Sequence, residues 1–225
     1  MRARFELCAE TVYAAKLAER GGADRVELCV NLKVGGVTPP ASMTREVMEA
    51  ISIPVHVLIR PRAGDFAYTP EEFAQMHAQI DEVKALGARG VVLGVLLSDG
   101  RVDVERTREL VEAARPMKVT FHRAFDEIAD MTEALEMVIA TGADWLLTSG
   151  GKANVLEGAE AIAGLVRQAA ERIEVMAGGG LRLANIKEVL RRTGVRWLHG
   201  SLLRHDAGGD VHEEDVLEAM CLLCQ

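Results

Sequence analysis

A chain of 225 residues is long enough for one large domain with its own core, and we expect a single domain over residues 1–225. Its composition, 49% hydrophobic and 27% charged, argues against a disordered or fibrous protein. The net charge is −8 and the basic residues are scattered, so the sequence lacks the basic patch of a nucleic-acid binder. We therefore expect a small-molecule or protein partner and no nucleic acid.

The first residues reach a carboxylate at Glu6 before any long apolar stretch, so we expect no signal peptide. No apolar run approaches the roughly 18 residues of a membrane span. These features predict a cytoplasmic protein without a membrane segment. Four cysteines are too few for a disulfide scaffold at this length, and a reducing compartment would keep them as thiols.

Short apolar runs alternate with segments of helical periodicity, which is the pattern of repeated βα units. The expected strands are Phe5–Cys8, Arg25–Cys29, Val55–Ile59, Val91–Val95, Val119–His122, Trp145–Thr148, Ile173–Met176 and Trp197–His199. The expected helices are Val12–Arg20, Thr44–Ala50, Pro70–Leu86, Val104–Ala114, Met131–Ala140, Glu157–Arg172, Asn185–Arg192 and Glu213–Leu223. Eight strands favour a closed (β/α)8 TIM barrel, of class α/β, over an open doubly wound sheet. The glycine-containing stretch His205–Val211 is expected to be loosely ordered.

In a TIM barrel, functional side chains project from the C-terminal ends of the strands, and the first two strands share a pattern there. Glu6 and Cys8 are two residues apart, as are Glu27 and Cys29, so each pair lies on one face of its strand. If that face points inward, two carboxylates lie within the barrel and two thiols lie at its mouth. Paired thiolates are soft ligands suited to Cu(I) or Zn, but free cysteines are also commonly buried without a ligand.

The third strand leads into a loop that carries Arg60 and Arg62 beside a proline and a glycine. Two guanidinium groups at a barrel mouth suit a phosphate or carboxylate ligand, because each offers a planar fork of donors. Alternatively, the two arginines neutralise the glutamates of the barrel.

The fifth strand ends in Thr120-Phe121-His122-Arg123-Ala124-Phe125-Asp126. His122 is a candidate general base or metal ligand, or else a hydrogen-bonded structural histidine. Asp126 is a further candidate for proton transfer, and His199 adds an imidazole at the end of the last strand.

Glycine-rich turns follow the sixth and seventh strands. The first contains Thr148, Gly150 and Gly151, and the second contains Gly178, Gly179 and Gly180. Such turns expose backbone N–H groups, and a phosphate site near the last strands is recurrent in TIM barrels. We interpret these residues as candidate anion-binding groups, with tight-turn geometry as the alternative.

Two further pairs of residues are assigned to packing. Cys221 and Cys224 form a Cys-x-x-Cys pattern on the last expected helix without a second ligand pair nearby, unlike a zinc ribbon or a redox motif. Trp145 and Trp197 lie inside expected strands and are interpreted as core or strand-face residues.

Several of these motifs resemble those of the CutC family. The resemblance is carried, colinearly from Phe5 to Ser201, by Glu6-Leu7-Cys8, Ala23–Cys29, Asn31–Pro39, Ile59–Tyr68, Thr120–Asp126, Leu147–Gly151 and Gly178–Gly180. It implies a cytoplasmic TIM barrel, frequently oligomeric, that is associated with copper homeostasis. It also implies Cu(I) binding by the strand-end cysteines, here Cys8 and Cys29. Lys33 and Pro40 depart from the family pattern and concern only local loop geometry.

Two functions follow as hypotheses. The first is a copper homeostasis protein with Cys8 and Cys29 as Cu(I) ligands, supported by His122 or His199. The second is an enzyme acting on a phosphorylated or carboxylated metabolite. In the enzyme, the anion-binding groups would be Arg60, Arg62, Thr148, Gly150, Gly151 and Gly178–Gly180, and the proton-transfer groups would be Glu6, Glu27, His122 and Asp126.

Overall fold

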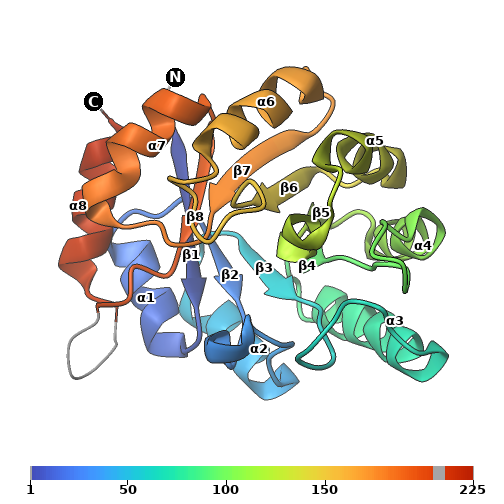
Figure 1. The fold of residues 1–225 in the computed structure, drawn as a ribbon. Helices are drawn as coiled ribbons and strands as arrows, with labels where there is room; N and C mark the ends of the chain where they lie inside the picture. The colour runs from blue at the N-terminus through green and yellow to red at the C-terminus, as the bar shows by residue number, and fades with distance from the viewer. Residues whose placement is uncertain (1, 205–210, 225) are drawn as a thin grey trace.

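Parallel strands form a closed barrel in the computed structural model, which describes residues 2–204 and 211–224 (Figure 1). The strands are β1 (Arg4–Ala9), β2 (Arg25–Leu28), β3 (Val55–Leu58), β4 (Gly90–Leu93), β5 (Lys118–Phe121), β6 (Trp145–Thr148), β7 (Glu174–Gly178) and β8 (Trp197–Gly200). Each strand pairs with the next along the chain, and β8 pairs with β1. The prediction of a (β/α)8 TIM barrel is confirmed. All of the expected loose stretch His205–Val211 except Val211 lies outside the described residues.

Helices alternate with the strands and surround the barrel (Figure 1). They are α1 (Val12–Arg20), α2 (Ala41–Ala50), α3 (Pro70–Ala85), α4 (Val104–Ala114), α5 (Met131–Thr141), α6 (Ala159–Ala169), α7 (Ile186–Thr193) and α8 (Glu213–Leu223). The helix α6 is shorter than expected, because Ala170 and Glu171 adopt left-handed φ angles of 45° and 62° that end it.

The two faces of the sheet differ in polarity. Residues that face the helices are apolar and fully buried, for example Phe5 and Leu7 in β1 and Val26 and Leu28 in β2. The alternate positions point into the barrel and include charged groups. In the strand register Glu6 lies opposite Arg25 of β2 and His199 of β8. The strand periodicity therefore directs ionisable side chains into the barrel interior.

The lower interior of the barrel is filled by a cluster of Glu6, Arg25, His56, Trp145 and Trp197, which we call the floor cluster. The Arg25 guanidinium lies 4.5 Å from the ring of Trp145 and 4.3 Å from that of Trp197, at cation–π distance from both. Its Nε donates to Glu6 Oε2 at 2.5 Å. Arg25, Trp145 and Trp197 are the first residues of β2, β6 and β8, so the cluster lies at the N-terminal ends of the strands.

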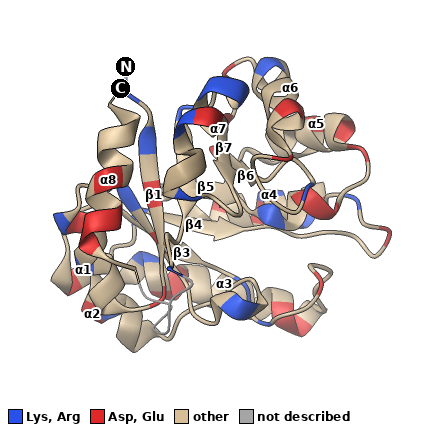
Figure 2. Ribbon diagram, turned by 60° about the vertical axis from the view of Figure 1, so that its left-hand side comes forward, with Lys and Arg blue, Asp and Glu red and all other residues tan. Residues whose placement is uncertain are grey.

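Figure 2 shows acidic and basic residues interspersed over the outer helices in that view. No helix among the described residues is both long and apolar enough to cross a membrane.

Candidate functional site

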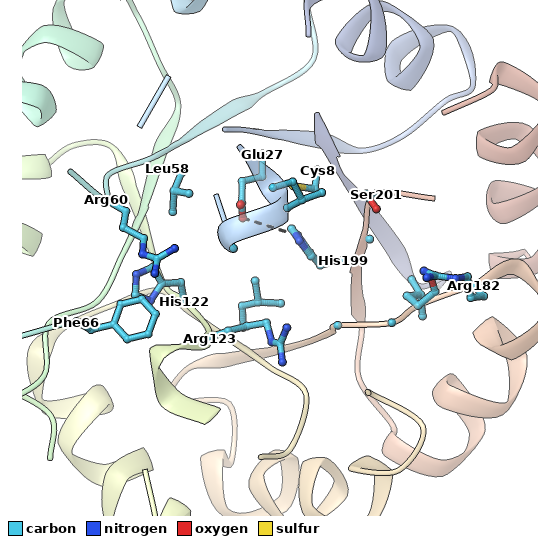
Figure 3. A pocket seen from close by; sticks show the side chains of 17 residues that line it. Cys8, Glu27, Leu58, Arg60, Phe66, His122, Arg123, Arg182, His199 and Ser201 are labelled. Carbon is cyan, nitrogen blue, oxygen red and sulfur yellow. Dashed lines mark hydrogen bonds and ion pairs between the residues drawn. The ribbon is translucent and has the colours of Figure 1, made fainter. Parts of the chain in front are cut away.

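A cavity of about 300 Å³ opens at the C-terminal ends of the strands, the face where TIM barrels carry their functional groups (Figure 3). It is lined by residues that lie in or follow β1, β2, β3, β5, β6, β7 and β8. Its polar side chains are Cys8, Glu27, Arg60, His122, Arg123, Arg182, His199 and Ser201. Its apolar side chains are Leu32, Leu58, Phe66, Leu147 and Leu181.

Two thiols lie next to each other; Cys8 lines the cavity, and Cys29 is not among the lining residues. Cys8 is in β1, and Cys29 immediately follows β2, where its N–H donates to the carbonyl of Ala9. The two Sγ atoms are 3.6 Å apart, and both residues are buried beside Leu58 and Val92. The contact with Cys29, together with burial, raises the pKa of Cys8 well above its usual range. The Cys8 thiol is therefore protonated at neutral pH unless an electrophile or metal replaces its proton.

Glu27 and His199 complete a compact group with Cys8. Ligand atoms of these three residues all lie within 4.8 Å of one another, close enough to share one metal ion. Glu27 Oε2 is 3.8 Å from His199 Nδ1, as the dashed line in Figure 3 marks. Burial raises the pKa of Glu27 to about 7. Burial would lower the pKa of His199, but the carboxylates of Glu27 and Glu6 raise it above its usual value.

Glu6 lies beneath this group and does not line the cavity. Its side chain is fully buried between Arg25 and His199, with Oε1 2.8 Å from His199 Nδ1. Burial would raise its pKa, but Arg25 and His199 lower it to about 2. Glu6 is therefore an ionised carboxylate that orients His199 and leaves the Nε2 atom of that ring for other partners.

Arg60, His122 and Phe66 form one end of the cavity, and Arg182 lies at the other (Figure 3). Arg60 donates through Nη1 to the carbonyls of Val34 and Gly36 and through Nη2 to that of Gly64. Phe66 contacts both Arg60 and His122: its ring centroid lies 4.7 Å from the guanidinium and 4.8 Å from the imidazole centroid. Burial and the charge of Arg60 lower the pKa of His122 to about 3, so its ring is neutral at physiological pH.

The family model that describes the CutC family matches residues 3–204, nearly the whole barrel. The chain belongs to the CutC family. A family protein CutC of Porphyromonas gingivalis is 47% identical over 92% of this chain and 83% of its own length. One from Mesorhizobium japonicum is 45% identical over 89% of this chain and 78% of its own length.

Solved structures give the same family and fold. The CutC protein of Streptococcus agalactiae superposes with a TM-score of 0.83. Its name proposes a role in copper homeostasis. It is 33% identical over 88% of this chain and 98% of its own. Thiamine phosphate pyrophosphorylase of Pyrococcus furiosus is 17% identical with a TM-score of 0.67, over 98% of this chain and 95% of its own, and shares the fold.

Asp126 of this CutC-family chain, a candidate for proton transfer, instead organises the loop after β6. Its Oδ1 accepts from Thr148 Oγ1 and from the N–H groups of Ser149 and Gly151. Its Oδ2 accepts from Arg123 Nε. Neither this carboxylate nor Thr148, Gly150 and Gly151 line the cavity. The glycines here serve a tight turn, with φ angles of 72° at Gly150 and 66° at Gly151.

Of the remaining candidate anion-binding groups, some line the cavity and others do not. Arg62 turns outward and pairs with Asp65 and Glu72, so the structure does not bring it to the cavity. Gly179 and Gly180 line the cavity, whereas Gly178 packs closely against His199 and Leu147 inside the barrel. A Cβ at Gly178 would lie 2.8 Å from Leu147 Cδ1, so this glycine permits close packing.

Sequence reasoning named no role for Phe66, Arg123, Arg182 or Ser201, which all line the cavity. Arg123 had a signal, because it stands between His122 and Asp126 in the motif after β5. Cys221 and Cys224 were expected to pack, but both are exposed. The helix α8 directs Val216, Ala219 and Leu223 to the core, which leaves these two cysteines on its outer side.

Proposed function

We propose that this chain is a copper homeostasis protein that binds Cu(I) through Cys8 and Cys29. The observation that carries the proposal is the 3.6 Å separation of the two buried Sγ atoms at neighbouring strand ends. The name of the Streptococcus agalactiae protein proposes a role in copper homeostasis, and this supports copper as the metal.

The donor set fits a soft cation. Cys8 Sγ lies 3.6 Å from Cys29 Sγ and within 4.8 Å of a ring nitrogen of His199 and a carboxylate oxygen of Glu27. Sulfur and imidazole nitrogen are ligands that Cu(I) prefers, whereas Mg²⁺ and Ca²⁺ prefer oxygen. Because the pKa of Cys8 is raised, binding must displace its proton, so affinity should increase at least tenfold per pH unit near neutrality.

The test is an anaerobic Cu(I) competition titration against a chromogenic chelator. Wild type should bind one Cu(I), and Cys8→Ser and Cys29→Ser should each weaken binding strongly. The matched control is Cys221→Ser with Cys224→Ser, which removes the two exposed thiols and should leave the buried site intact. Equal affinity in wild type and the Cys8→Ser/Cys29→Ser variant would contradict the proposal.

A second candidate is an enzyme acting on a small phosphorylated or carboxylated metabolite. The observation that favours it is that Glu27 lines the cavity and that its buried Oε2 atom has no hydrogen-bond partner in the described part of the chain. Beside His199, this carboxyl could exchange a proton with a bound substrate. The two candidates compete for His199, so bound copper would block this chemistry.

The enzyme candidate is tested by screening such metabolites for conversion by NMR, with wild type and Glu27→Gln compared on every hit. Turnover that is lost in Glu27→Gln would support it, and turnover equal in both proteins would contradict a role for Glu27. Residence in the cytoplasm and assembly into a homo-oligomer stay predictions from the sequence.

A further inference from the structure

Two arginines are buried in the barrel, and only one of them has a counter-ion. Arg25 and Arg60 are 2% and 5% exposed. Arg25 pairs with Glu6 at 2.5 Å, but no carboxylate among the described residues lies within ion-pair distance of Arg60. A buried charge is costly unless it is compensated, and three carbonyl dipoles and the face of Phe66 compensate that of Arg60 only in part.

His122 presents an unused donor at the same end of the cavity. Its Nδ1 accepts the N–H of Ala124 at 3.3 Å, so the neutral ring carries its proton on Nε2. His122 is 6% exposed, and its Nε2 has no partner among residues 2–204 and 211–224. A buried N–H without an acceptor in a cavity wall indicates a ligand that supplies one.

We propose that the Arg60–His122 end of the cavity binds the carboxylate of a small organic acid. One oxygen accepts from His122 Nε2, and the negative charge compensates Arg60. The carbon body packs on Phe66 and Leu58, inside the cavity of about 300 Å³. The subsite requires no copper, and it would name the substrate class of the second candidate function above.

The charge balance favours a carboxylate over a phosphate. Arg123, which follows His122 in the sequence and lines the same cavity, already bonds Asp126 through Nε and Ser149 through Nη2. The Arg60 end therefore offers one positive charge that the protein compensates only in part, whereas a phosphate monoester carries nearly two negative charges at neutral pH.

The test is calorimetric titration of the metal-free full chain with three probes: isobutyrate, its neutral analogue isobutyramide, and inorganic phosphate. Wild type should bind isobutyrate most tightly. His122→Phe keeps a ring against Phe66 but removes the donor, and should weaken isobutyrate binding about tenfold. His77→Phe is the matched control, because that histidine lies on α3 outside the cavity, and it should leave the affinity unchanged.

A measurement on wild type keeps the test independent of how the variants fold. The His122 Nε2 resonance should shift on addition of isobutyrate, while that of His56, in the floor cluster, should not. Tighter binding of phosphate or isobutyramide, an unmoved His122 resonance, or unchanged affinity in a folded His122→Phe would each overturn the proposal. Because the titration contains no metal, failure of Cu(I) binding does not affect its outcome.

Discussion

The Nδ1 atom of His199 lies 2.8 Å from Oε1 of Glu6; both groups are buried, and His199 lines the cavity whereas Glu6 does not. The first and last strands therefore contribute the two halves of one buried contact. Its electrostatic effect is measurable, because an adjacent carboxylate favours the imidazolium form.

Replacing Glu6 by Gln should lower the pKa of His199, since one of the two carboxylates that raise it is removed. An NMR pH titration of the ring measures this shift. Glu188→Gln, on the outer helix α7, is the control and should leave the titration unchanged. A His199 pKa equal in wild type and Glu6→Gln would contradict the assigned contact.

The raised pKa of Glu27 predicts a pH-dependent stability. A carboxyl whose pKa rises from 4.5 to about 7 on folding favours the protonated form in the native state. The contribution of Glu27 to the free energy of unfolding is therefore fully present below pH 4.5 and is lost as the pH rises towards 7. Over this window wild type should lose on the order of 2 kcal/mol relative to Glu27→Gln, as measured by urea unfolding at each pH. Parallel pH profiles for the two proteins would refute the shift.

Arg25→Met should destabilise the fold strongly, because it leaves the carboxylate of Glu6 buried without its counter-ion. The expected loss in the free energy of unfolding is about 3–5 kcal/mol. Adding Glu6→Gln should recover part of this loss, because it removes the buried charge that lacks a counter-ion. The control is Arg2→Met, which breaks the more exposed pair with Asp24 and should cost about 0–1 kcal/mol. Equal losses in the Arg25 and Arg2 variants would be inconsistent with a buried pair.

Asp126→Ala should act on stability, because it removes the acceptor for donors of the loop after β6. We expect a loss of about 2–4 kcal/mol in urea unfolding. Asp130→Ala is a matched control, because that carboxylate caps α5 and its loss should cost about 1 kcal/mol. A fully stable Asp126→Ala would show that the loop does not depend on this carboxylate.

The fold and the thiol pair were predictable because both depend on short periodicities. Alternation of strand and helix patterns indicated the barrel, and the spacing of two residues placed Glu6 with Cys8 on one face. The closed register then brought Cys8 close to Cys29, which follows the neighbouring strand.

Loop conformation limited the rest of the prediction. Arg60 and Arg62 are also two residues apart, but they follow the end of β3, where side chains no longer alternate between two faces. Arg60 is buried, whereas Arg62 is not. Phe66 reaches the cavity through the same loop. Asp126 lies in a short 3-10 helix, Arg123–Glu127, that turns it towards the β6 loop. The sequence spacing of such residues does not specify their direction.

The pairing of β1 with β8 also has a consequence for folding during synthesis. Cys8 belongs to the first strand made and His199 to the last, so a nascent chain that ends before residue 197 lacks one wall of the cavity. Only ring closure brings the two together, after nearly the whole chain has been made. A ligand held by both residues therefore binds the closed barrel and not the incomplete chain. Binding of such a ligand indicates that the barrel has closed.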